Sequence, residues 1–147
     1  MLLKYPKVLL LIVTLTLIAG TLQACSGSRA SADLKMLPMD KMPAEVQAAP
    51  SVVQAAYSYA AANPDVMKGI PCYCGCGSIG HTSNYSCYVQ AAAANGAITW
   101  DDHALGCSIC VDITQDAMRL SRQGKTVPEI KAYVDSTYGK YGTSNMP

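Results

Sequence analysis

The chain has 147 residues, of which half are hydrophobic, and its formal net charge is +1 at pH 7. Basic residues form no stripe along it, so we do not expect nucleic acid as a partner. Phenylalanine is absent and tryptophan occurs once. Large core side chains are therefore scarce, and a small domain of this composition is expected to depend on metal ions or disulfides for stability.

Residues 1–24 predict a lipoprotein signal peptide. Lys4 and Lys7 precede an apolar run over residues 8–19, which is too short and too close to the N-terminus for an ordinary membrane span. The Leu-Gln-Ala-Cys sequence that ends at Cys25 then resembles a bacterial lipobox, in which the cysteine is lipidated and becomes the new N-terminus. The alternatives are an uncleaved anchor and an ordinary signal peptide cleaved close to this point.

Lipidation at Cys25 predicts where the protein works. Acyl chains such as palmitate on this residue would hold the protein on the bacterial cell membrane, with its domain on the extracytoplasmic side. Residues 25–50 are rich in serine, alanine, methionine and proline without a sustained period, which predicts a flexible membrane tether. The remaining residues, 51–147, are expected to form one Cys-rich helical domain.

Helical periodicity starts at Ser51 and is ended by Asn63-Pro64. Residues 69–85 contain Pro71 and four glycines, which predicts an irregular loop. A short alanine-rich helix is then expected over about residues 86–94, stopped by Asn95-Gly96.

The clearest helix carries Ile109, Ile113, Ala117 and Leu120 on one face, with Gly124 where a C-cap is expected. Residues 126–129 (Thr-Val-Pro-Glu) predict a capping box that starts a last helix, which Gly139 closes. Two-residue alternation is nowhere long enough to indicate a sheet. We therefore predict an all-α fold, a small helical bundle with an irregular Cys-rich loop.

Six cysteines and two histidines within one window are the candidate functional residues. As candidate metal ligands they are Cys72, Cys74, Cys76, His81, Cys87, His103, Cys107 and Cys110. Same-face side chains of a strand lie about 6–7 Å apart, which is too far for thiolates that share one metal ion. The loop must therefore curl between Cys72 and Cys76, and Gly75 and Gly77 supply the backbone freedom for it.

Three interpretations of these thiols remain open. They are metal ligands, a redox dithiol at Cys107 and Cys110, or members of three disulfide bonds that staple an interaction domain. The dithiol is expected at the start of the long helix, where amide donors and the helix dipole stabilise thiolate. His103 joins it if the chain before Cys107 is helical, and His81 follows the loop closely enough to complete a second site.

The intact Pro-Cys-Tyr-Cys-Gly-Cys sequence at residues 71–76 resembles the bacterial lipoproteins that contain this PCYCGC motif. The similarity continues through His81, Cys87, His103 and the Cys107-x-x-Cys110 pair, and it implies an exported, lipid-anchored, cysteine-rich protein. A second similarity joins the C-terminal third to the small helical thiol subunit of cytochrome c maturation. It implies an extracytoplasmic thiol–disulfide redox role.

The sequence favours metal binding over the other two interpretations. We expect the clustered cysteines and histidines to hold copper or zinc, because thiolate and imidazole suit both Cu(I) and Zn(II). The expected use is sequestration, or delivery to an extracytoplasmic metalloprotein partner. No catalytic residue is assigned, and an enzyme is the less favoured class.

Overall fold

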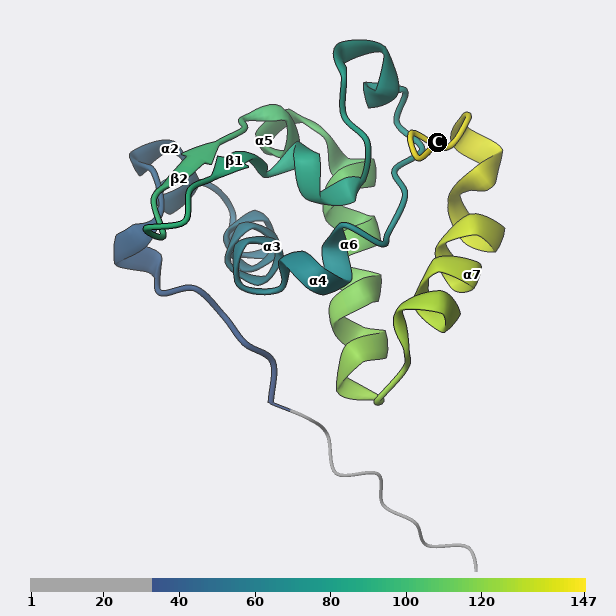
Figure 1. Ribbon diagram of the computed structural model, residues 1–147, viewed down its shortest axis with the longest axis horizontal. Coiled ribbons are helices and arrows are strands. Elements are labelled where there is room, and N and C mark those ends of the chain that lie inside the picture. The colour runs from purple at the N-terminus through teal and green to yellow at the C-terminus, as the bar shows by residue number, and fades with distance from the viewer. Residues whose placement is uncertain (1–32) are drawn as a thin grey trace, which may run out of the picture. The chain divides into compact units, whose positions relative to one another are not determined.

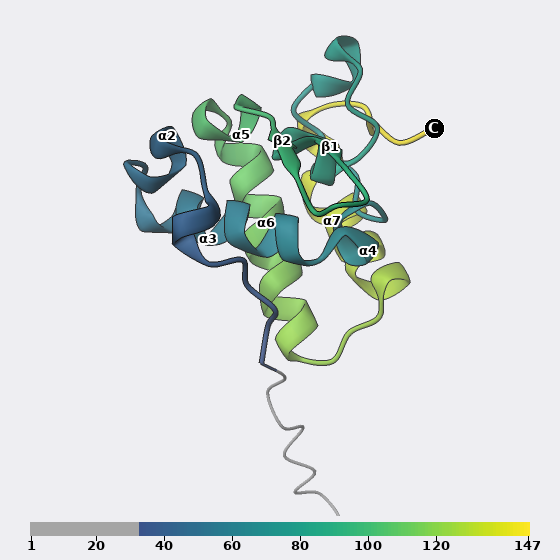
Figure 2. The same cartoon turned by 60° about the vertical axis from the view of Figure 1, so that its left-hand side comes forward.

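The computed structural model describes residues 33–147, which Figures 1 and 2 show from two directions. The α-helices and strands in chain order are α2 (Ala44–Gln47), α3 (Ser51–Ala62), α4 (Pro64–Met67), β1 (Val89–Ala92), β2 (Ile98–Trp100), α5 (His103–Gly106), α6 (Ser108–Arg122) and α7 (Val127–Tyr138). Short 3-10 helices are η2 (Met39–Lys41), η3 (Cys76–Ile79), η4 (Asn84–Cys87) and η5 (Gly139–Tyr141). Within this part of the chain, none of the helices combines the length and the apolar character that crossing a membrane demands.

Helix α6 is the central element of the domain. It packs against α3 on one side and α7 on the other (Figure 1). The predicted apolar face is confirmed, because Ile113, Ala117 and Leu120 are all buried. After the helix, Gly124 takes a positive φ of 71° and the chain turns back toward α7.

The predicted capping box starts α7. The Glu129 carboxylate accepts hydrogen bonds from the backbone N–H of Thr126 (2.8 Å) and from its hydroxyl (2.9 Å). These bonds and the salt bridge to Lys125 fix the end of α7 from which Ile130 and Val134 enter the core. The helix ends at Tyr138, just before Gly139, as the sequence predicts.

The predicted all-α fold is wrong, because β1 and β2 pair as a two-stranded antiparallel sheet. The expected helix over residues 86–94 is instead η4 followed by β1. Asn95-Gly96 lies in the turn that joins the strands, and Gly96 has a φ of 85°. Cross-strand pairing with Ile98 to Trp100, which are residues that favour strands, outweighs the helical preference of the alanines.

The packed residues begin before Ser51, where the sequence places the start of the domain. Leu37 and Ser58 exchange hydrogen bonds, with Leu37 N–H donating to the Ser58 carbonyl (3.1 Å) and the Ser58 hydroxyl to the Leu37 carbonyl (2.7 Å). Met42 and Val46 are buried in the core. Much of the predicted tether therefore packs against α3. The predicted signal peptide and Cys25 lie outside the described residues.

Tyrosine takes the place of phenylalanine in this core. Tyr57, Tyr59 and Tyr88 are almost completely buried, and the rings of Tyr57 and Tyr88 meet edge to face at 4.9 Å. Each hydroxyl has a partner, and Tyr57 donates to the backbone carbonyl of Asp101 at 2.8 Å. Burial raises the pKa of all three phenols, so they stay neutral hydrogen-bonding groups.

The capping box predicts a defined acid sensitivity. Hydrogen bonds from Lys125 and Thr126 lower the pKa of Glu129 to about 2. A carboxyl whose pKa falls on folding stabilises the fold above its unfolded pKa and loses that effect as pH falls toward its folded pKa. Glu129→Gln should therefore lower the melting temperature by a few degrees at pH 7 and by less at pH 3, measured by circular dichroism.

The matched control is Glu45→Gln. It removes the same charge from an exposed glutamate in the first turn of α2, and within residues 33–147 no hydrogen bond engages that carboxylate. Its effect should be smaller at pH 7. Equal effects of the two substitutions at both pH values would show that the charge of Glu129 adds nothing to the stability of the capping box.

Candidate metal centre

The PCYCGC loop curls as its spacing predicts. Gly75 has a φ of 85°, and η3 begins at the next residue, Cys76. This turn returns the sulfur of Cys76 to within 4.8 Å of that of Cys72, and the sulfur of Cys74 lies 3.3 Å from that of Cys72. A Cβ atom at Gly77 would lie 3.4 Å from the side chain of Asn145, so the loop also passes closely under the C-terminal residues.

The second pair of thiols lies at the start of α6, as predicted. Cys107 is the N-cap residue and Cys110 is the third residue of the helix, with their sulfurs 3.2 Å apart. Cys107 is half-buried and Cys110 is fully buried. The free N–H groups and the helix dipole favour negative charge at this end of α6.

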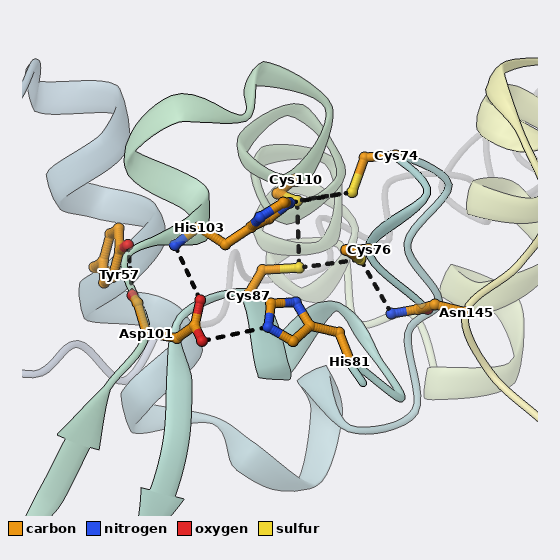
Figure 3. A network of polar contacts seen from close by, with 9 residues as sticks. All are labelled: Tyr57, Cys74, Cys76, His81, Cys87, Asp101, His103, Cys110 and Asn145. Atoms are coloured by element: carbon orange, nitrogen blue, oxygen red, sulfur yellow. Dashed lines mark hydrogen bonds and ion pairs between the residues drawn. The ribbon is translucent and has the colours of Figure 1, made fainter. Parts of the chain in front are cut away.

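Cys110 is the central sulfur of the whole set. Its Sγ lies 3.2 Å from Cys107, 3.3 Å from Cys87, 3.4 Å from Cys72 and 3.5 Å from Cys74. Cys76 joins through Cys87 at 3.7 Å. Figure 3 shows four of these residues converging from the loop, η4 and α6. The structure therefore brings all six predicted thiols into one contiguous cluster.

These distances are not those of disulfide bonds. Bonded sulfurs lie about 2.05 Å apart, and all six cysteines within residues 33–147 are free. The predicted disulfides are therefore not found in this part of the chain. Tetrahedral ligation with metal–sulfur bonds of about 2.3 Å places neighbouring sulfurs about 3.8 Å apart. The observed spacing of 3.2–3.7 Å is close to that value.

The ligand atoms fall into two groups that meet at Cys110. In what we call the four-ligand group, Cys74, His103, Cys107 and Cys110 have ligand atoms within 4.8 Å of one another. In the buried trio, the sulfurs of Cys72, Cys76 and Cys87 satisfy the same limit. Eight residues were predicted to be ligands, and these two groups contain seven of them.

The two histidines occupy different positions. His103 begins α5, and its Nε2 lies 3.4 Å from the Cys74 sulfur, so the helical turn expected before Cys107 is present. His81 lies outside both groups, although it is 8% exposed and its ring meets that of His103 edge to face at 5.2 Å. The structure thus places His103 at a candidate site and His81 beside it.

Asp101 is a site residue that the sequence analysis missed. One carboxylate oxygen lies 3.3 Å from His81 Nε2, and the other accepts the backbone N–H of His103 at 2.9 Å (Figure 3). The sequence suggests only that Asp101-Asp102 starts a helix. An aspartate side chain often accepts the backbone N–H two residues further along the chain, which here is that of His103. This tendency was the signal in the sequence that could have identified Asp101.

Polar side chains outside the cluster hold its backbone. The hydroxyl of Tyr88 donates to the carbonyl of Cys110 at 2.8 Å. Asn145 forms two hydrogen bonds with Cys72. Its side-chain oxygen accepts the Cys72 N–H (2.7 Å), and its backbone N–H donates to the Cys72 carbonyl (3.1 Å). The side-chain amide nitrogen of Asn145 also lies 3.5 Å from the Cys76 sulfur. No local sequence pattern predicts these long-range contacts.

Ionisation of the thiols is shared across the cluster. Hydrogen bonds with Cys110 and Cys87 lower the pKa of Cys72, whereas the contact with Cys72 raises the pKa of Cys110. Burial raises the pKa of Cys74. A second charged sulfur would lie only 3.3–3.4 Å from the first. The thiols alone therefore accommodate little negative charge, and a cation among them would favour further ionisation.

Comparison with known proteins identifies the family. No curated protein and no solved structure matches the chain, and no comparison supports the similarity to the cytochrome c maturation subunit. A family model described as "Protein of unknown function with PCYCGC motif" matches residues 18–146, which include the motif at residues 71–76 and every residue of the candidate centre. The chain therefore belongs to the family of PCYCGC-motif proteins of unknown function.

Proposed function

We propose that this protein is an exported, membrane-anchored lipoprotein that binds a thiophilic metal ion through the four-ligand group. The observation that carries the proposal is the convergence of its three sulfurs and one imidazole nitrogen within 4.8 Å. These residues come from the loop, α5 and the start of α6, which are separate segments of the chain. Three thiolates and one imidazole form a complete tetrahedral ligand set.

Exposure of the ligands supports reversible loading. Cys74, His103 and Cys107 are each half-buried, whereas Cys110 lies at the back of the group and is fully buried. An ion can therefore reach the first three from solvent before it contacts the fourth. A site that is open on one side suits sequestration, or transfer to an extracytoplasmic metalloprotein that presents its own ligands.

The donor atoms restrict the metal to a few ions. Thiolate and imidazole suit Cu(I) and Zn(II), whereas Mg²⁺ and Ca²⁺ prefer oxygen ligands. The four-ligand group contains no carboxylate. Copper and zinc are therefore the ions with which we propose that the site is loaded.

A dithiol redox function is the second candidate. Cys107 is half-buried at the N-cap of α6, and Cys110 is its natural partner, with the two sulfurs 3.2 Å apart. However, Cys110 also contacts three other cysteine sulfurs, any of which can compete for a disulfide with it. A metal site uses all these contacts, and a two-cysteine redox cycle does not.

The first test of the proposal is metal-dependent stability. Zn(II) or Cu(I) should raise the melting temperature of the reduced full-length protein, with stabilisation of about 2.7 kcal/mol at a free metal concentration 100-fold above Kd. The gain should shrink on acidification, because protons compete for thiolate and imidazole. Cys74→Ser should lose most of the gain, and the control Cys25→Ser should keep it. An equal gain in Cys74→Ser, or none in the unmodified chain, contradicts the proposal.

The membrane anchor is tested separately. Cys25→Ser should abolish incorporation of labelled palmitate and release the protein from membranes, because the modified sulfur is lost. Ser26→Ala, which leaves the cysteine in place, should do neither. Continued membrane binding of the Cys25→Ser protein would show that an uncleaved N-terminal segment is the anchor.

A turnover assay separates the two candidate functions. We expect the reduced protein to reduce a model disulfide no faster than its Cys110→Ser variant, because metal binding requires no redox cycle. Catalytic turnover that Cys110→Ser abolishes and Cys76→Ser preserves would favour the redox candidate instead.

A further inference from the structure

The buried trio has no role in the function proposed above. Cys72, Cys76 and Cys87 are 0%, 3% and 0% exposed, and their sulfurs lie within 4.8 Å of one another. Cys72 and Cys87 also lie 3.4 Å and 3.3 Å from the Cys110 sulfur of the four-ligand group. Three thiols are thus concentrated directly behind the first candidate site.

His81 carries a buried ring nitrogen without a partner, and its backbone N–H donates to the carbonyl of Cys76, a member of the trio, at 3.3 Å. Among the described residues, Nδ1 of His81 is the one buried side-chain nitrogen or oxygen atom that makes no hydrogen bond. In the view of Figure 3 its edge of the ring is turned away from Asp101, to the side on which Cys87 and Cys76 lie. Buried polar atoms normally have a partner, so this nitrogen is a candidate metal ligand.

Asp101 fixes the ring in the form that a metal ligand needs. Its carboxylate is only an acceptor, so His81 donates from Nε2 across their 3.3 Å contact. In the neutral ring Nδ1 then carries the lone pair. A carboxylate on the far nitrogen is the usual support of a metal-binding histidine. The same carboxylate holds the backbone N–H of His103, which connects the two groups.

We propose that the chain holds a second metal ion, bound by the buried trio and His81 at a site directly beside the first, so that the two ions form one dinuclear centre. This inference rests on the proposed function, because the second site adjoins the first through Cys110. His81 lies outside the 4.8 Å limit of the trio, so its ring must move closer to the three sulfurs when the second ion binds. Each ion then receives three sulfurs and one imidazole nitrogen, and all eight cysteine and histidine ligands of the domain are used. The second ion also compensates the charge that ionised thiols would bring into this buried space.

Native mass spectrometry of the reduced Cys25→Ser protein, titrated with Zn(II) and separately with Cu(I), tests this inference. We expect two ions per chain for at least one of these metals. Alkylation should show partial protection of the six domain thiols after one equivalent and full protection after two. This measurement requires no substitution within the site.

The outcomes separate the two proposals. Two ions support both, and one ion, or more than two, overturns the dinuclear centre while the proposed function stands. Absence of any bound ion overturns both. Full protection of all six thiols by a single equivalent also overturns the inference.

Substitutions then assign the second ion to its ligands. Cys76→Ser should leave one ion, because Cys76 belongs to the buried trio and the four-ligand group keeps all its ligands. His81→Ala should weaken binding of the second ion strongly. Loss of a residue that only supports a ligand typically lowers metal affinity about 10–100-fold, and the loss here should be larger. The assignment is overturned if either variant loses the first ion, or if both variants bind the two ions as the unmodified chain does.

Asp101 offers a matched pair of variants for its positioning role. Asp101→Asn should lower the affinity for the second ion about 10–100-fold. Asp102→Asn, at the exposed neighbouring position, should leave this affinity unchanged. Metal-free melting temperatures show whether each variant folds. Equal affinities in the two variants would mean that Asp101 does not support His81.

Discussion

The crowding of five cysteine sulfurs around that of Cys110 is the constraint on which the rest of this structure depends. Four of these sulfurs lie within 3.5 Å of the Cys110 sulfur, too far for a covalent bond and too close for several negative charges to coexist without a cation. The domain must therefore bring the thiols together against their mutual repulsion whenever they ionise. Rigid packing around them is what makes this arrangement possible.

Helix α6 supplies most of that rigidity. It carries Cys110 at its first turn, while its buried face, from Ile113 to Leu120, packs between α3 and α7. Tyr88 reaches the Cys110 carbonyl from the chain that leads into the β1–β2 hairpin. The position of the central sulfur is thus tied to the tyrosine-rich core, so the site and the fold are stabilised by the same contacts.

Local patterns in the sequence predicted the parts of this fold that local physics determines. The apolar spacing of α6, the capping box at Thr126 and the loop curl at Gly75 each depend on residues a few positions apart, and each is confirmed. The β1–β2 hairpin was missed because alanine favours helix and Asn95-Gly96 can either end a helix or join two strands. Pairing with Ile98 to Trp100, just beyond this turn, decided between them.

The same distinction holds at the candidate centre. The clustering of thiols follows from their number and spacing, whereas the roles of Asp101 and Asn145 depend on contacts across the folded domain. His81 is intermediate, because its residue type suggested a ligand and only the structure shows a buried ring beside the trio. Met42 and Val46 also looked like linker residues until their burial against the domain was seen.

The contact between Asn145 and Cys72 has a consequence for how the protein is made. The two residues are separated by 73 positions, and synthesis proceeds from the N-terminus. The PCYCGC loop is therefore made well before the side chain that fastens it. The contacts that fasten the loop can therefore form only after Asn145 has been added, long after the loop itself has been synthesised.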